Sequence, residues 1–122
     1  MSGPLEGVNI LDVGTAGVGP WAATLLGYLG ANVVKVEGPA GDRHVGAMGA
    51  GGVMNGIPTL YTIAQLNKWT SSLDLKDPQY KKSVDRLVQQ ADVVMDNLRP
   101  GVVDRLGLGW TGWEQHNTVR WA

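Results

Sequence analysis

The sequence predicts an α/β protein built on a Rossmann-like open parallel sheet with flanking helices. Short apolar segments at residues 8–13, 32–37 and 91–95 have the length of strands that are buried on both faces. Between them stand segments whose apolar residues recur at helical spacing. Alternating strands and helices form βαβ units, and their crossovers bring the carboxyl ends of the strands to one edge of the sheet.

The first βαβ unit covers residues 8–37. Its first strand is followed by a run rich in small residues at 14–19, called the glycine turn below. Pro20 suits the first helical position because its φ is already fixed near the helical value. Gly30 should end this helix as a left-handed cap, and residues 32–37 form the second strand. Backbone N–H groups at the start of the helix favour an anionic group such as a phosphate.

The glycine turn fits a dinucleotide-binding fingerprint only in part. The frame in phase with the strand needs a glycine at position 16, where the chain has Ala16. A frame shifted to Gly17, Gly19 and Ala22 places Glu37 about twenty residues further on, but it starts about three residues late after the strand. The alternative explanation is that small residues here let helix and strand pack closely.

Beyond residue 37 the sequence predicts a loop and then the same alternation again. Residues 38–56 are dense in glycine, have no helical or strand period, and should form a flexible loop. The later elements are a short helix over 58–66, a strand over 71–75, a helix with Asp77 as N-cap and Pro78 at its first position, a strand over 91–95, a short helix opened by Pro100, helical turns over 110–117 and a strand over 119–122. We expect a single domain over residues 1–122, apparently truncated, because a new strand begins where the chain stops.

Composition excludes several classes of function. A chain of 122 residues with a net charge of −1 favours neither nucleic acid nor an anionic membrane surface as a partner. The chain contains no cysteine, which fits a reducing cytoplasm, and no apolar run approaches the roughly 18 residues that span a bilayer. His44 and His116 are far apart and stand without clustered carboxylates, so we expect no metal site.

Five blocks of sequence stand out along the chain: PLEGVNILDVGTAGVGP, LLGYLGANVVKVEGPAGD, NKW-x-SSLDLKDP, ADVVMDNLRPGVVDRLGLG and EQHN-x-VR. In this order and at this spacing they resemble the amino-terminal part of the family III (CaiB/BaiF) CoA-transferases. That group includes formyl-CoA and carnitine CoA-transferases and the 2-methylacyl-CoA racemases. The resemblance covers nearly the whole chain.

The resemblance implies a Rossmann-like sheet that binds coenzyme A, within chains that interlock as a homodimer. In the family's transferases an aspartate attacks the acyl-CoA thioester and forms a mixed anhydride, which divides one difficult exchange into easier steps. Coenzyme A is a substrate here, and the resemblance implies no metal. Carried over position by position, the CoA contacts would be Gly17, Val18, Leu73, Lys76, Asn97, Leu98 and Arg105.

The chain departs from the family pattern in three respects. Gly38 and Trp69 stand where members often have basic residues, which predicts weak CoA binding. The family's nucleophilic aspartate falls beyond the strand that begins near Val119, so we assign a catalytic role to none of the aspartates considered: Asp12, Asp42, Asp74, Asp92, Asp96 and Asp104. Asp12 is expected to be capped by local hydrogen bonds.

We therefore expect the CoA-binding, amino-terminal region of a family III CoA-transferase, inactive on its own and prone to self-association. Two alternatives remain open. One is a domain that binds NAD or another nucleotide through the glycine turn and Glu37. The other is a non-catalytic interaction module in which the fold survives and ligand binding does not.

Overall fold

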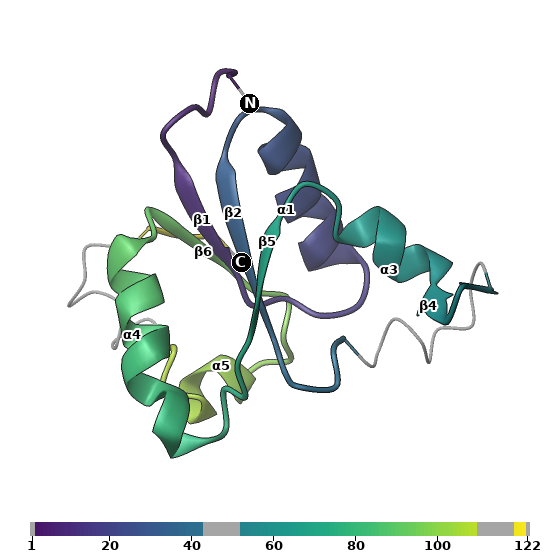
Figure 1. Ribbon diagram of the computed structural model, residues 1–122. Helices are drawn as coiled ribbons and strands as arrows, with labels where there is room; N and C mark the ends of the chain where they lie inside the picture. Colours follow the sequence, from purple (N-terminus) through teal and green to yellow (C-terminus); the bar gives the residue numbers. More distant parts are fainter. Residues whose placement is uncertain (1, 43–51, 110–118, 122) are drawn as a thin grey trace.

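A parallel sheet with the strand order β5-β2-β1-β6-β7 forms the centre of the computed structural model, which describes residues 2–42, 52–109 and 119–121 (Figure 1). The elements in chain order are β1 (Asn9–Asp12), α1 (Val18–Tyr28), β2 (Asn32–Glu37), β3 (Val53–Met54), β4 (Ile57–Pro58), α3 (Thr59–Ala64), β5 (Trp69–Ser72), the 3-10 helix η1 (Pro78–Tyr80), α4 (Lys81–Gln90), β6 (Val93–Met95), α5 (Val102–Arg105) and β7 (Val119–Trp121). The predicted α/β fold with an open parallel sheet is confirmed.

The order of the strands reverses at β1. The chain runs outward from β1 through β2 to β5, then returns to the other side of β1 with β6 and β7. All four pairings are parallel, so the strands end at the same edge of the sheet. In open parallel sheets ligands bind at the carboxyl edge where the order reverses, which here is between the turns that follow β1 and β6.

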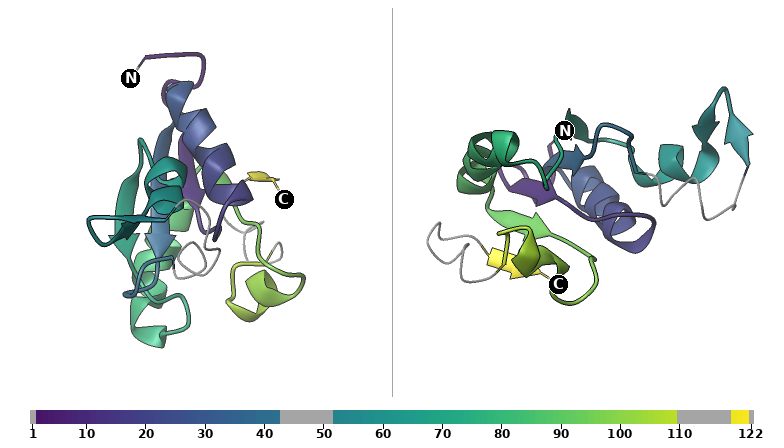
Figure 2. Two further views of the ribbon diagram at one scale, coloured as in Figure 1. Left: turned by 90° about the vertical axis from the view of Figure 1, so that its right-hand side faces the viewer. Right: turned by 90° about the horizontal axis from the view of Figure 1, so that it is seen from below.

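Helices cover both faces of the sheet, with α1 on one face and α4 on the other (Figures 1 and 2). The apolar core is divided in the same way. Towards α1 the core consists of Ile10, Ala23, Ala31 and Val33. Towards α4 and α5 it consists of Leu11, Val13, Val36, Val84, Val88, Val94, Val103 and Leu108. Alternate residues of β1 therefore serve opposite layers, as expected for a strand buried on both faces.

Several local signals of the sequence act as predicted. Gly30 has a φ of 103° just after α1, in the left-handed region that favours glycine at a helix end. The side chain of Asp77 accepts a hydrogen bond from the Gln79 N–H (3.0 Å), which caps the helical segment that begins at Pro78. Val84 and Val88 of α4 are buried, as the helical spacing predicted. The short helix over 58–66 and the strand near 119 are also present.

Three boundaries differ from the predictions. The first helix begins at Val18 and not at Pro20, which still leaves Pro20 in the first turn, where no N–H is needed. The third strand begins at Trp69 and not at 71. The sequence did not indicate this start, because an edge strand with one neighbour does not need an apolar sequence. The helix after residue 100 begins at Val102, preceded by Gly101 with a φ of 82°.

The prediction of a loop over residues 38–56 is wrong for its last residues. Val53–Met54 pairs antiparallel with Ile57–Pro58 in a small hairpin, with Asn55 and Gly56 at positive φ between the strands. Two-residue strands are too short to show a period in the sequence. Residues 43–51 and the helical turns predicted over 110–117 lie outside the described residues.

Candidate functional site

The glycine turn is held by the side chain of Asn97, which follows β6. Asn97 Oδ1 accepts from the Thr15 N–H (2.8 Å), and Asn97 Nδ2 donates to the Thr15 carbonyl (2.9 Å). A Cβ atom at Gly19 would lie 2.9 Å from Asn97 Cγ, and one at Gly14 would lie 2.9 Å from Asn97 Oδ1. These two glycines are therefore required for close packing. Gly17 differs, because a Cβ added there would meet nothing within 4 Å.

Position 16 carries the one left-handed residue in this turn. Ala16 has a φ of 59°, a conformation that costs a residue with a Cβ roughly 1–2 kcal/mol. Its N–H donates to Asp42 Oδ2 (2.7 Å). A carboxylate thus already occupies the N–H where a bound phosphate would be expected, and Asn97 occupies the neighbouring N–H of Thr15. The anion site predicted for the turn is therefore limited to the N–H groups from Gly17 onward.

A buried charge cluster, made of Asp12, Lys35 and Lys68, lies behind the glycine turn. Asp12 is 0% and Lys35 1% exposed, and the Lys68 side chain is 0% exposed. Lys68 Nζ lies 2.8 Å from Asp12 Oδ2, and Lys35 Nζ lies 3.7 Å from Asp12 Oδ1. Gly14 is bound to the cluster through its backbone. Its N–H donates to Asp12 Oδ1 (2.9 Å), and its carbonyl accepts from Lys35 Nζ.

Burial is the largest influence on Lys68, and it lowers the pKa of the ammonium below its ordinary value. The carboxylate of Asp12 opposes this by charge and by its hydrogen bond, and the charge of Asp42 also raises the pKa. Lys35 lowers it further. Because one carboxylate faces two buried ammonium groups, the charged form of each of the three side chains depends on the other two.

Glu37, at the end of β2, forms a second polar group at the same edge. The Tyr61 hydroxyl donates to Glu37 Oε1 (2.8 Å). Burial, the hydrogen bond to Glu37 and the nearby carboxylates raise the pKa of Tyr61 to about 12. Glu37 Oε2 is buried and has no hydrogen-bond partner among the residues that the structure describes. Such an oxygen can accept a hydrogen bond from a ligand or a water molecule.

Lys76 and Arg105 line a pocket of about 700 Å³ on the α4 and α5 side of the sheet. Lys81 contributes a third cation and Asp77 a carboxylate, and the other lining side chains are Leu75, Pro78, Val84, Val102, Leu106 and Leu108. Lys81 is paired with Asp85 at 2.7 Å, whereas neither Lys76 nor Arg105 forms a salt bridge with another described residue. Two cations without a salt bridge in the described part of the chain, beside apolar side chains, suit an anionic ligand that also has an apolar part.

The seven residues predicted as ligand contacts fall into separate groups. Gly17 and Val18 lie at the open part of the glycine turn, where Val18 is 80% exposed, and Asn97 braces that turn. Leu73 and Leu98 pack against the core on the α4 side. Lys76 and Arg105 line the pocket. All follow the carboxyl ends of strands, but Asn97 uses both ends of its amide on Thr15.

The charge cluster and Glu37–Tyr61 were not predicted from the sequence. Asp12 and Lys35 could have been found together, because each interrupts an apolar strand and their positions pair in register between β1 and β2. The local cap predicted for Asp12 is confirmed by its hydrogen bond from Gly14, but it is only part of the arrangement. Lys68 and Tyr61 come from distant segments, and no short pattern connects them to the turn.

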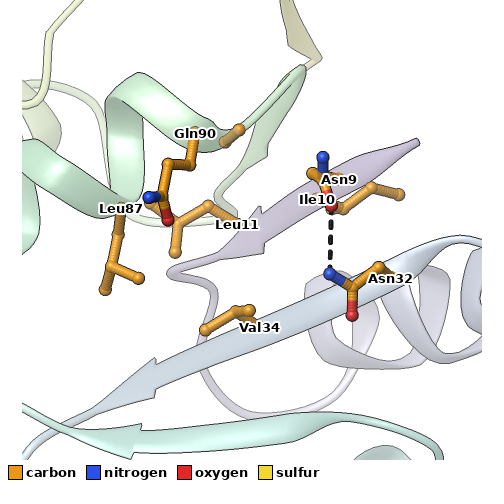
Figure 3. Close-up of a pocket in the computed structure, with 8 residues that line it drawn as sticks. Asn9, Ile10, Leu11, Asn32, Val34, Leu87 and Gln90 are labelled. Carbon is orange, nitrogen blue, oxygen red and sulfur yellow. Dashed lines mark hydrogen bonds between the residues drawn. The ribbon is translucent and has the colours of Figure 1, made fainter. Parts of the chain in front are cut away.

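A different pocket, of about 330 Å³, lies at the opposite edge of the sheet (Figure 3). It is bounded by the beginnings of β1 and β2 and by the end of α4, including Gln90. The side chains of Asn9 and Asn32 hydrogen-bond to each other across it (3.0 Å). No charged side chain lines this pocket, and it is remote from the glycine turn.

Within the described part of the chain, no group of three or more His, Cys, Asp or Glu residues is arranged to hold a metal ion. His44 and His116 lie outside that part. None of the described helices is long and apolar enough to cross a membrane.

Comparisons with known proteins identify relatives along almost the whole chain. A family model described as CoA-transferase family III matches residues 5–118. Formyl-CoA:oxalate CoA-transferase of Streptomyces avermitilis is 37% identical over 111 residues, which cover 90% of this chain and 26% of that protein. The succinyl-CoA–L-malate CoA-transferase beta subunit of Chloroflexus aurantiacus is 35% identical over 107 residues, covering 88% of this chain and 26% of that protein.

The fold has the same relatives. A crystal structure of a CAIB/BAIF family protein from Brucella suis superimposes with a TM-score of 0.86 and 28% identity, over 98% of this chain and 33% of that one. The chain thus spans 26% of the length of each of the two curated relatives above.

Proposed function

The chain belongs to CoA-transferase family III, and from this premise we propose that its 122 residues form the CoA-binding part of an enzyme that moves CoA between an acyl-CoA and a carboxylic acid. Family membership supports the reaction class. The two curated relatives described above are both named as CoA-transferases.

The pocket beside Lys76 and Arg105 is the observation that supports CoA binding most directly. CoA carries phosphates at one end, an apolar and amide-containing arm, and a thiol at the other end. Lys76 and Arg105, without salt bridges among the described residues, can each meet a phosphate, and the apolar floor of the pocket suits the arm. At the same edge Val18 is exposed and a Cβ added at half-buried Gly17 would meet nothing within 4 Å, which leaves room for a ligand to pass along the glycine turn.

We propose that these residues bind CoA and do not carry out transfer alone. The reaction needs a free carboxylate that attacks the thioester carbonyl, forms a mixed anhydride and releases the CoA thiolate. Asp12 is held between two lysines, and the carboxylates of Asp74, Asp77 and Asp92 each accept from a backbone N–H. A group engaged in this way is a poor nucleophile, so a carboxylate outside this set must serve.

Calorimetric titration with CoA tests the binding proposal. Lys76→Ala and Arg105→Ala should each weaken binding by about 1–2 kcal/mol, or roughly 5- to 30-fold, if each charge meets a phosphate. Lys82→Ala is the matched control, because Lys82 is exposed on α4 and does not line the pocket. Equal dissociation constants for all four proteins would refute the site.

Binding of NAD or another nucleotide is a second candidate, favoured by Glu37 at the end of β2. Its buried Oε2, which has no partner in the described part of the chain, could accept from a ribose hydroxyl. The glycine turn argues against this candidate, since Asp42 and Asn97 already occupy the N–H groups that a pyrophosphate would need. NAD in the same titration separates the two, because a signal with NAD alone would favour the nucleotide.

We further propose that two copies associate through β5. Among the described residues this strand pairs with β2 alone; it has no charged side chain, and its Trp69 is 73% exposed. Edge strands of monomers are usually protected by charge, proline or a bulge, and β5 has none of these. A second copy can cover both the open edge and Trp69.

A further inference from the structure

Lys68 connects three elements at one point behind the glycine turn. Its Nζ donates to Asp12 Oδ2 at the end of β1 (2.8 Å) and to the Pro20 carbonyl in the first turn of α1 (2.7 Å). The Ala64 carbonyl at the end of α3 (3.0 Å) and Gln65 Oε1 (3.0 Å) complete its surroundings. An ammonium group has three donors, and here four acceptors lie within hydrogen-bond distance of it.

The residue before it explains how Lys68 reaches this point. Asn67 has a φ of 57°, in the left-handed region that asparagine tolerates better than most residues. This bend comes between α3 and β5, close to Gly27, where an added Cβ would lie 3.2 Å from Asn67. The Asn67-Lys68 pair is therefore a local device that directs one cation inward.

We propose that Lys68 is a positioning residue for the ligand-binding turn, which it holds through Asp12 on one side and through the start of α1 on the other. Asp12 in turn fixes the Gly14 N–H (2.9 Å), so Lys68 restrains both ends of the glycine turn. Between these two anchors a Cβ added at Gly17 would meet nothing within 4 Å, the Val18 side chain is exposed, and the Gly17 carbonyl accepts from the Trp21 N–H (2.9 Å), so the position of Gly17 and Val18 depends on the anchors and on the first turn of α1. The inference rests on the proposed CoA binding for its ligand, but not for the contacts themselves.

Charge distinguishes this role from simple packing. The groups that face Lys68 are Asp12, Lys35 and Asp42, and of these Asp12 contributes most in favour of the charged form. Loss of one Lys68 proton leaves a neutral amine with two N–H donors, so it removes one donor and the charge attraction to the Asp12 carboxylate. Because burial lowers its pKa, Lys68 loses its proton at a lower pH than an exposed lysine.

Acetyl-CoA binding to Lys68→Met, Lys68→Arg and the wild-type chain, measured by calorimetry across the alkaline range, tests the proposal. We expect Lys68→Met to weaken binding about tenfold at neutral pH and Lys68→Arg to restore most of it, since a tenfold change corresponds to the loss of one modest interaction. In the wild type, affinity should fall with rising pH earlier than in Lys68→Arg, because arginine stays charged. Lys76 and Lys81 are the same in both proteins and cannot cause the difference. Lys82→Met, which removes an exposed charge, is the control and should match the wild type.

Amide exchange supplies a readout that does not need the ligand. In Lys68→Met the N–H groups of residues 14–16, which donate to Asp12, Asn97 and Asp42, should exchange at least tenfold faster, while those of Leu11 and Val94 keep their protection. An unchanged affinity together with unchanged exchange in the turn would overturn the proposal. If the wild type binds no acetyl-CoA, the proposed function fails, and exchange alone decides whether Lys68 restrains the turn. Should Lys68→Met not fold, Gln65→Leu, which removes one acceptor of Lys68, replaces it in both measurements.

Discussion

Because Asp12 lies in the buried charge cluster, its replacement should lower the free energy of unfolding strongly even when the new side chain has the same shape. Asp12→Asn keeps the size of the side chain and an oxygen for the Gly14 N–H, but it removes the only described negative charge in contact with the ammonium groups of Lys35 and Lys68. Two buried cations then remain with no carboxylate of the described residues in contact with them. Removing one partner of a buried ion pair is far more costly than the net value of the pair, because the other charge stays desolvated.

The magnitude follows from the distances. At separations of 2.8 Å and 3.7 Å, the two attractions amount to roughly 6 and 4.5 kcal/mol with an effective dielectric constant of about 20. The desolvation of the carboxylate, several kcal/mol, offsets part of this sum. We therefore expect Asp12→Asn to lower the free energy of unfolding by about 3–5 kcal/mol, a large share of the stability of a domain of this size.

Urea unfolding of Asp12→Asn and of a matched variant, Asp85→Asn, measures the effect. Asp85 pairs with Lys81 at 2.7 Å, but these side chains are 38% and 58% exposed, so this loss should cost at most about 1 kcal/mol. Adding Lys68→Met to Asp12→Asn should cost less than the sum of the two single changes, since it removes one of the unpaired charges. If Asp12→Asn is no more destabilising than Asp85→Asn, the reasoning about the buried cluster is refuted.

Three further predictions concern the turn, the tyrosine and the open edge. Gly19→Ala should destabilise the protein by about 1–3 kcal/mol, because its Cβ would lie 2.9 Å from Asn97 Cγ. Gly17→Ala, whose Cβ would meet no atom within 4 Å, should cost well under that. Thermal unfolding measures both, and equal costs would contradict the packing argument. The pKa of Tyr61 is raised to about 12 from an ordinary 10.0, so the folded chain holds this proton longer than the unfolded one, and stability should fall as pH rises from 10 to about 12. Tyr61→Phe should lack this fall in unfolding titrations, and a fall of equal size in both proteins would assign it to another group. Light scattering at high concentration should find a dimer for the wild type and a monomer for Trp69→Lys, because the lysine places a charge on the edge strand β5. A monomeric wild type would rule out the proposed association.

The alternation of strands and helices was predictable because its signals are local. Apolar runs such as residues 8–13, the cap at Gly30 and the N-cap at Asp77 each depend on a few neighbouring residues, and the structure confirms them. The weak points were elements without such signals. The polar edge strand β5 and the two-residue strands of the hairpin are held by hydrogen bonds to their partner strands. Their sequences contain no apolar pattern from which a strand could be predicted.

The candidate site was predictable only where it follows the ends of strands. The topology brings the turns after β1 and β6 together, as expected from a parallel sheet, and the Asn97–Thr15 hydrogen bonds show that contact. The cluster behind the turn depends on Lys68, which is 56 residues from Asp12 in the sequence. No periodicity or spacing rule connects residues so far apart, so their contact becomes visible only in three dimensions.

Calorimetric titration of CoA into the 122-residue chain, with Lys76→Ala and Arg105→Ala beside it, tests the central claim most directly. The account predicts saturable binding of CoA, weaker binding by each variant and no comparable signal with NAD. Absence of CoA binding by the folded wild-type chain, or equal binding by the wild type and both variants, would contradict it.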